Sequence, residues 1–210
     1  MCEVTPETTF SAARRLRAGA EAVAALNFAS AKNPGGGFLG GAQAQEEDLC
    51  RHSALYASLT TPQAASYYAQ NRQSGTALYT HHLIYSPAVP IFRDELGKLL
   101  ETPVTVNVIT APAPNAGAVA QNSPAQLPQV RPTLRERAAR VLGAAALTGQ
   151  THLVLGAWGC GVFRNDPAEV ARIFRELLDG EARGVFGKVT FAIYDRSKDK
   201  ATLGAFEAAF

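Results

Sequence analysis

The residues best suited to chemistry form one short acidic run, Gln45-Glu46-Glu47-Asp48, which follows a glycine-rich segment at residues 33–41. Glycines let a backbone approach a ligand closely, and a helix N-terminus adds a favourable field for an anion. A carboxylate beside such a loop is placed for general acid catalysis on a ribose. The helix macrodipole favours the same acidic first turn without any catalytic role, so both interpretations stand at this point.

The two glutamates are not expected to act as an equivalent pair. Adjacent residues on a helix diverge by roughly 100°, so Glu46 and Glu47 do not form the facing carboxylates of an ordinary glycosidase. One of them is expected to transfer the proton while the other holds hydroxyl groups of the substrate. The spacing alone does not say which.

A second glycine-rich segment, residues 156–163, has the sequence Gly-Ala-Trp-Gly-Cys-Gly-Val-Phe. Like the first, it follows an apolar strand and precedes a helix. Two such loops at one edge of a sheet favour a phosphate-bearing ligand over glycines needed only for turns. Trp158 is expected to pack against other residues rather than to bind.

The first loop also matches a dinucleotide-binding fingerprint, with glycines at positions 35, 37 and 40. That interpretation needs an acidic residue at the end of a second strand about twenty positions further on, and the sequence has none there. A Rossmann-type oxidoreductase is therefore a weak alternative. Neither loop is followed by a Walker lysine, so ATP hydrolysis is not supported either.

Apolar segments and helix signals alternate along the chain. Strands are expected at residues 3–4, 21–30, 81–85, 89–93, 104–109, 152–157 and 188–194. Helices are expected at residues 5–20, 45–59, 133–147 and 166–180, and from about residue 200. Three of these helices begin at recognisable caps: Thr5 with Pro6, a capping box at residues 133–136, and Asp166 with Pro167.

Residues 111–132 carry five prolines and no apolar periodicity, which predicts a long loop. Apolar strands alternating with capped helices predict an α/β fold whose largely parallel sheet is covered on both faces. A chain of 210 residues favours a single domain over residues 1–210. Ligands of such folds bind in loops at the carboxyl ends of the strands.

The composition, with 47% hydrophobic and 18% charged residues, is that of an ordinary globular protein. A net charge of +2 argues against a nucleic-acid partner. Cys2, Cys50 and Cys160 lack the spacing of a disulfide framework or a zinc site, and adjacent His81 and His82 point to opposite faces of a strand. No apolar run suits a membrane span and no secretory leader opens the chain. We expect a cytoplasmic protein without metal, other cofactor or membrane partner.

Residues 27–38 read Asn-Phe-Ala-Ser-Ala-Lys-Asn-Pro-Gly-Gly-Gly-Phe, and Gln45-Glu46-Glu47 follows the last glycine after the seven residues 38–44. This pattern closely resembles the bacterial-type poly(ADP-ribose) glycohydrolases of the macrodomain superfamily. Residues 5–9, 111–115 and 156–163 are also similar to segments of that family, so the resemblance covers nearly the whole chain.

The resemblance implies a macrodomain-like three-layer α/β/α sandwich with a mixed, largely parallel central sheet. It implies an enzyme that hydrolyses the ribose–ribose O-glycosidic bond of poly(ADP-ribose) and releases ADP-ribose without a cofactor. Poly(ADP-ribose) or ADP-ribose would be its ligand, and ADP-ribosylated proteins would be its substrates. Members of the family usually carry a helical segment ahead of the region matched by residues 5–9, so an upstream portion is expected to be absent here.

The resemblance also implies roles for the residues of the first loop. Glu47 would be the catalytic acid–base, and Glu46 and Asn33 would bind hydroxyls of the ribose that is released. The remaining motif residues expected to bind substrate are Gly36, Gly37 and Gln45.

In the second loop, the resemblance implies a diphosphate site lined by Gly159, Cys160, Gly161 and Val162. Phe163 would pack against the distal ribose. Tyr194 would stack on adenine, as aromatic residues there do in macrodomains, or would be an ordinary half-buried tyrosine at a strand end.

Two further alternatives lie within the same fold. A macrodomain hydrolase that removes single ADP-ribose units would lack the Gln-Glu-Glu sequence. A non-catalytic ADP-ribose reader would need only the glycine loops, so an intact Glu47 argues against it.

Overall fold

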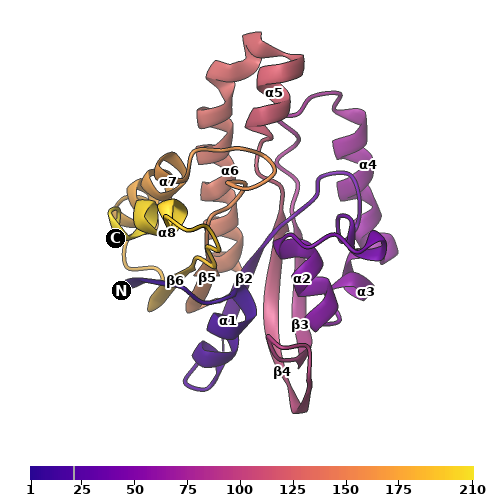
Figure 1. Ribbon diagram of the computed structural model, residues 1–210, viewed down its shortest axis with the longest axis vertical. Helices are drawn as coiled ribbons and strands as arrows, with labels where there is room; N and C mark the ends of the chain where they lie inside the picture. Colours follow the sequence, from indigo (N-terminus) through magenta and orange to yellow (C-terminus); the bar gives the residue numbers. More distant parts are fainter. Residues whose placement is uncertain (21) are drawn as a thin grey trace.

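A six-stranded sheet in the order β1-β6-β5-β2-β4-β3 runs through the computed structural model, which describes residues 1–20 and 22–210 (Figure 1). Neighbouring strands are parallel except for the antiparallel pair β3 and β4. The predicted mixed, largely parallel sheet is therefore confirmed. The strands are β1 (Cys2–Thr5), β2 (Val23–Phe28), β3 (Ile84–Arg93), β4 (Leu99–Ala111), β5 (His152–Leu155) and β6 (Lys188–Ala192).

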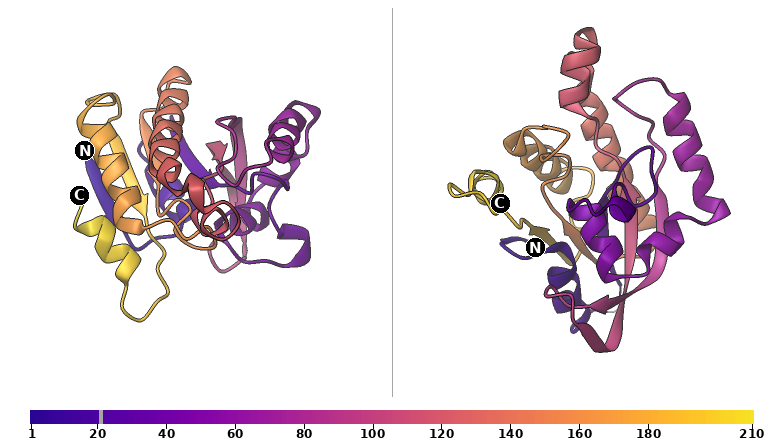
Figure 2. Two further views of the ribbon diagram at one scale, coloured as in Figure 1. Left: turned by 90° about the horizontal axis from the view of Figure 1, so that it is seen from above. Right: turned by 45° about the vertical axis from the view of Figure 1, so that its right-hand side comes forward.

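Helices cover both faces of the sheet, which confirms the three-layer α/β/α sandwich (Figure 2). The α-helices are α1 (Thr9–Arg17), α2 (Gln45–His52), α3 (Leu55–Leu59), α4 (Ala65–Gln73), α5 (Ala116–Asn122), α6 (Leu127–Leu147), α7 (Pro167–Asp179) and α8 (Ala201–Glu207). Alternation along β2 separates two cores. Ala24 and Leu26 pack with α6, α7 and α8, whereas Val23 and Ala25 pack with α1, α2 and α3.

The predicted loop at residues 111–132 is wrong. Most of it is helical, because it holds α5 and the first turns of α6. Pro128 lies in the first turn of α6, where a missing N–H costs nothing, and Pro132 lies further along the same helix. The predicted capping box at residues 133–136 is wrong for the same reason, since α6 is already under way there.

Other boundaries also differ from the sequence-based expectation, and β4 begins at Leu99 rather than at residue 104. Helix α1 begins at Thr9 with Thr8 as its N-cap, because the Thr8 side chain accepts from the Ser11 N–H. The expected helix at residues 45–59 is two helices, and the buried Ser53 between them forms a β-bridge with Ile91. The two strands expected around residue 87 are one strand, β3, which has two register shifts. It begins at Ile84, so His81 and His82 lie outside it, and the expectation that they point to opposite faces of a strand is wrong. The expected strand at residues 21–30 includes Glu21, which lies outside the described residues.

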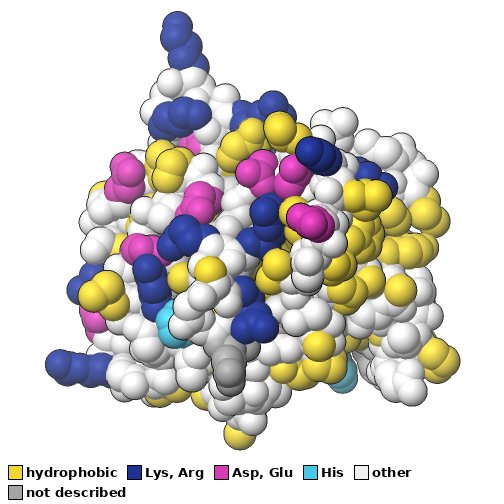
Figure 3. Space-filling view, turned by 90° about the horizontal axis from the view of Figure 1, so that it is seen from below, with side chains coloured by type: hydrophobic (Ala, Val, Ile, Leu, Met, Phe, Trp, Pro, Cys, Tyr) yellow, Lys and Arg dark blue, Asp and Glu magenta, His cyan; other side chains and the backbone are white. Residues whose placement is uncertain are grey.

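On the face seen in Figure 3, Lys and Arg side chains lie among Asp and Glu side chains rather than in one basic stripe. No helix within residues 1–20 and 22–210 is long and apolar enough to cross a membrane.

Candidate active site

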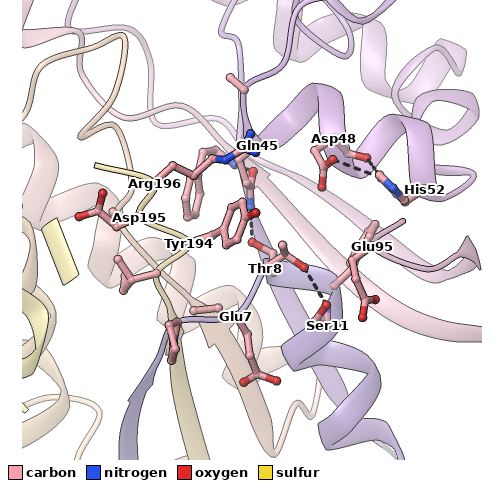
Figure 4. Close-up of a pocket in the computed structure, with 18 of the residues that line it drawn as sticks. Glu7, Thr8, Ser11, Gln45, Asp48, His52, Glu95, Tyr194, Asp195 and Arg196 are labelled. Atoms are coloured by element: carbon pink, nitrogen blue, oxygen red, sulfur yellow. Dashed lines mark hydrogen bonds and ion pairs between the residues drawn. The ribbon is translucent and has the colours of Figure 1, made fainter. Parts of the chain in front are cut away.

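The loops that follow the parallel strands surround a cavity of about 950 Å³ at the carboxyl ends of β1, β2, β5 and β6. Helices α1 and α2 and the turn between β3 and β4 complete its wall. Gln45 and Tyr194 line this cavity although they come from distant parts of the sequence (Figure 4). Cys160 and Gly161 line it as well. The cavity is thus lined by the second glycine-rich loop and by the start of α2, which follows the first loop, whereas residues 33–41, Glu46 and Glu47 are not among its lining residues.

Glu47 lies directly under the first glycine loop. Its Oε1 accepts a hydrogen bond from the Gly37 N–H at 2.8 Å, and its buried Oε2 has no hydrogen-bond partner. Gly36 has φ of +60°, and a Cβ there would lie 2.3 Å from Glu47 Oε1. Only glycine combines this backbone conformation with room for the carboxylate. The glycine loop and Glu47 are thus built around each other.

Glu46 is 2% exposed and is held by the protein itself. Its Oε2 accepts from the Ser30 N–H at 2.7 Å, and its Oε1 accepts from Asn27 Nδ2 at 3.2 Å. Burial raises the pKa of Glu46 to about 8, against the opposing effect of these two hydrogen bonds, and the charge of Glu47 adds to the rise. Burial thus favours the protonated form of Glu46, and that form has less repulsion with Glu47.

Gln45 joins the start of α2 to the end of β2. Its Oε1 accepts from the Phe28 N–H at 2.8 Å, and its Nε2 donates to Leu26 O and Thr9 Oγ1 at 2.9 and 3.0 Å. Asn33 is exposed on the first glycine loop, and its backbone N–H donates to Ser30 Oγ.

The second glycine loop is held by neutral groups. Trp158 is fully buried and its Nε1 donates to Ala111 O at 3.0 Å, so it packs in the core as expected. Asn165 Nδ2 donates to Gly159 O and Pro114 O at 3.1 and 2.9 Å. Gly159 has φ of +75°, and a Cβ there would lie 2.5 Å from Asn165 Nδ2. Asn165 was not predicted from the sequence, because a single asparagine carries no spacing signal.

The outer residues of this loop differ in exposure. Val162 is 81% exposed, whereas Phe163 is half-buried with its ring centroid 5.9 Å from that of Tyr79. Tyr194 lies beyond the end of β6 and is 59% exposed, with Arg196 Cζ 5.7 Å from its ring centroid (Figure 4). Tyr194 is thus more exposed than an ordinary half-buried residue at a strand end.

No group of three or more His, Cys, Asp or Glu side chains that could hold a metal ion occurs among residues 1–20 and 22–210. His81 lies beside Glu136, with His81 Nε2 3.4 Å from Glu136 Oε2. Burial lowers the pKa of His81.

Comparison with known proteins decides between the alternatives. The family model for the catalytic domain of microbial-type poly(ADP-ribose) glycohydrolase matches residues 1–94. The crystal structure of the poly(ADP-ribose) glycohydrolase from Deinococcus radiodurans in complex with ADP-ribose is 75% identical in sequence, with a TM-score of 0.98, and the match covers 100% of this chain and 83% of that one. The chain belongs to the bacterial poly(ADP-ribose) glycohydrolases.

A second glycohydrolase of this family, from Thermomonospora curvata, is 51% identical with a TM-score of 0.94, over 100% of this chain and 76% of that one. That enzyme has also been crystallised with the inhibitor ADP-HPD. No curated protein sequence matches the chain. The resemblance to poly(ADP-ribose) glycohydrolases is confirmed, and the protein is a glycosidase rather than a Rossmann-type oxidoreductase.

Proposed function

We propose that Glu47 is the acid–base catalyst with which this glycohydrolase cuts the ribose–ribose O-glycosidic bond of poly(ADP-ribose). The observation that carries the proposal is the asymmetry of its carboxyl group. The Gly37 N–H fixes Oε1, while Oε2 is buried under the glycine loop without a partner. An oriented oxygen with an unused hydrogen-bonding position suits proton transfer to a substrate.

The reaction then follows in two steps. Protonated Glu47 donates its proton to the 2′-oxygen of the leaving ribose, and the bond from that oxygen to C1 of the distal ribose breaks as C1 becomes oxocarbenium-like. The Glu47 carboxylate next takes a proton from water, whose oxygen bonds to C1. ADP-ribose is released and Glu47 is again protonated, so neither metal nor redox cofactor is consumed.

Glu46 and Asn33 are proposed to bind hydroxyl groups of the released ribose. The raised pKa of Glu46, about 8, supports this role because a neutral carboxyl group both donates and accepts hydrogen bonds. Gly36 and Gly37 let the ribose approach the two glutamates, and Gln45 contributes by fixing the start of α2.

The second loop is proposed to bind the remainder of ADP-ribose. Its residues Gly159, Cys160, Gly161 and Val162 would line the diphosphate, and Phe163 would contact the distal ribose. Tyr194 would stack on adenine. Its exposure at the cavity, with Arg196 already over its ring, supports this because the ring face is accessible to a flat ligand.

ADP-ribose bound in the Deinococcus radiodurans enzyme supports ADP-ribose as product and ligand here. We propose ADP-ribosylated proteins as the macromolecular substrates, since they carry the polymer. We also propose a cytoplasmic location, which is supported by the unpaired thiols of Cys2, Cys50 and Cys160.

The test is to incubate the protein with poly(ADP-ribose) and to quantify released ADP-ribose by chromatography. Glu47→Gln is expected to lower turnover by ~10²–10⁴-fold, the usual contribution of a general acid–base group. Its affinity for ADP-ribose should stay within about tenfold of wild type, because the two side chains have the same shape.

Two matched variants complete this experiment. Glu46→Gln should retain more activity than Glu47→Gln, and the reverse order would exchange the two roles. Glu101→Gln removes an exposed carboxylate of β4 that does not line the cavity, and it should leave turnover near that of wild type. Near-normal turnover of Glu47→Gln would contradict the mechanism.

A further inference from the structure

Asn27 is a fully buried amide in β2, a strand whose other residues are apolar. It lies directly opposite Thr110 of β4 in the parallel register, and Thr110 is also fully buried. Its Nδ2 donates both to Thr110 Oγ1 and to Glu46 Oε1, each at 3.2 Å. Its Oδ1 has no hydrogen-bond partner. A buried polar group is costly in an apolar sheet, so its contact with Glu46 calls for an explanation.

The surroundings of Glu46 make this contact important. Titratable groups face it from its own helix, α2, and from α4: these are Glu47, Cys50, Tyr67 and Tyr68. Strands β2 and β4 bring only the neutral side chains of Asn27 and Thr110. None of the ion pairs among the described residues includes Glu46. The position of the Glu46 carboxyl group therefore depends on neutral donors, namely the backbone at Ser30 and the side chain of Asn27.

An amide suits this position because it can serve both states of a carboxyl group. With Nδ2 toward Glu46, as in the structure, it donates to the carboxylate. If the Asn27 amide were rotated by half a turn, its Oδ1 would accept hydrogen bonds from protonated Glu46 and from the Thr110 hydroxyl. Either orientation leaves one end of the amide without a partner, so the state of Glu46 decides between them. Leucine has a similar shape but neither capability.

We infer that Asn27, braced by Thr110, is a positioning residue that holds the Glu46 carboxyl group for the ribose hydroxyls in either protonation state. This inference rests on the role proposed above for Glu46. Asn27 itself lies beneath the site and is not exposed to substrate.

The experiment compares the pH dependence of kcat for poly(ADP-ribose) hydrolysis in wild type and Asn27→Leu. The substitution removes a hydrogen bond that favours the charged form of Glu46, so the ionisation of Glu46 should move to higher pH. We expect kcat at neutral pH to fall about tenfold, which corresponds to the loss of one hydrogen bond. One part of the pH profile of kcat should depend on Glu46, and its absence in Glu46→Gln would identify it. We expect this part to move to higher pH in Asn27→Leu.

Asn107→Leu is the matched control. Asn107 is an amide of β4 that donates to Gln150 and accepts from the Ala88 N–H, away from α2. Asn107→Leu should keep the wild-type pH profile. A shift of equal size in Asn107→Leu would mean that loss of any sheet amide alters the profile, and would overturn the inference.

A double-mutant comparison separates this inference from the role of Glu46. If Asn27 acts through Glu46, Asn27→Leu should have no further effect on kcat in a Glu46→Gln background. An equal loss in both backgrounds would overturn the inference while leaving the role of Glu46 intact. If Glu46→Gln alone had wild-type kcat and pH profile, the proposed role of Glu46 would fail instead.

Should Asn27→Leu not fold, Thr110→Val is the second variant, because it removes only the hydroxyl that contacts Asn27. It should shift the Glu46-dependent part of the pH profile in the same direction but by less. An unchanged profile would overturn the inference.

Discussion

Each of the two glycine-rich loops has a position at which a side chain would collide with a neighbouring group, and the neighbouring groups differ between the loops. In the first loop, a side chain at Gly36 would collide with the Glu47 carboxylate. In the second, a side chain at Gly159 would collide with Ala113 and the Asn165 amide. The first loop is thus shaped around ionisable groups, whereas the second is shaped around neutral ones.

This difference predicts that the first loop affects chemistry and the second affects binding. Changes that disturb the first loop displace Glu47, the proposed proton-transfer group, and should appear mainly in kcat. Changes in the second loop should appear mainly in affinity for ADP-ribose. Only the first loop is coupled to a group whose pKa is shifted into the physiological range, Glu46.

Gly36→Ala should break the first loop most severely. The added methyl group would lie 2.3 Å from Glu47 Oε1, and φ of +60° adds backbone strain. We expect kcat for polymer hydrolysis to fall by about 100-fold or more, as for removal of the general acid. Gly75→Ala is the control, because Gly75 has a similar φ of +65° but nothing within 4 Å. Wild-type kcat in Gly36→Ala would show that Glu47 does not depend on the loop.

Gly161→Val tests whether the second loop touches the ligand. No atom lies within 4 Å of a Cβ at Gly161, so the fold should tolerate the change. We expect ADP-ribose affinity, measured by calorimetry, to fall by about 2 kcal/mol or roughly 30-fold. The thermal midpoint should be unchanged. Unaltered affinity would mean that the loop is only a turn.

Asn165→Leu tests the brace of the second loop. It leaves Gly159 O and Pro114 O without the donor that now joins them. We expect about a tenfold weaker affinity for ADP-ribose, equivalent to one hydrogen bond, together with a thermal midpoint lower by a few degrees. The comparison of the loops predicts that kcat at saturating polymer stays near wild type. A loss confined to kcat would reverse the assignment.

A separate expected effect is on stability against pH. The pKa of Glu46 rises from 4.5 to about 8 in the folded protein. Between these values the unfolded chain loses a proton that the folded protein keeps, so stability falls as pH rises through this window. Glu46→Gln stays neutral and should unfold at a higher temperature than wild type at pH 8, with the difference shrinking toward pH 5. Thermal unfolding at both pH values is the measurement, and Asn165→Leu should keep the wild-type pH slope.

Helix boundaries were predicted correctly where capping residues close in the sequence determine them. Helix α7 starts and ends as expected because Asp166 caps it ahead of Pro167 and Gly180 terminates it. The prolines at residues 111–132 misled the prediction, since Pro128 falls in a first turn, where proline is compatible with a helix. Helix α4 was not predicted, and its residues lack an apolar face of helical period.

The site shows the same division. The motif Gln45-Glu46-Glu47 and the glycines of the first loop lie close together in sequence, so their pattern drew attention to them. Asn27 and Asn165 are single polar residues that gain their roles only when the fold places them beside Glu46 and Gly159. No spacing rule could have selected them.

Strand β5 pairs with only the first half of β2, so the second half of β2 has no strand neighbour on that side. Pairing of β2 with β5 ends at Ala25 opposite Val154, whereas its pairing with β4 continues to the end of the strand. The Ala29 N–H donates to Ala111 O on the β4 side. Alternation along the strand therefore directs the backbone groups of residues 26 and 28 to the side that β5 has vacated.

The Gln45 side chain takes the place of the missing strand there, because a primary amide offers the same donor and acceptor as a peptide group. It accepts from the Phe28 N–H and donates to Leu26 O, as a neighbouring backbone would. These two hydrogen bonds fix the first turn of α2 relative to the backbone of β2. The positions of Glu46 and Glu47 therefore depend on where Gln45 bonds along the strand. Changes in length among residues 38–44 can then be absorbed by the loop without moving the two carboxyl groups.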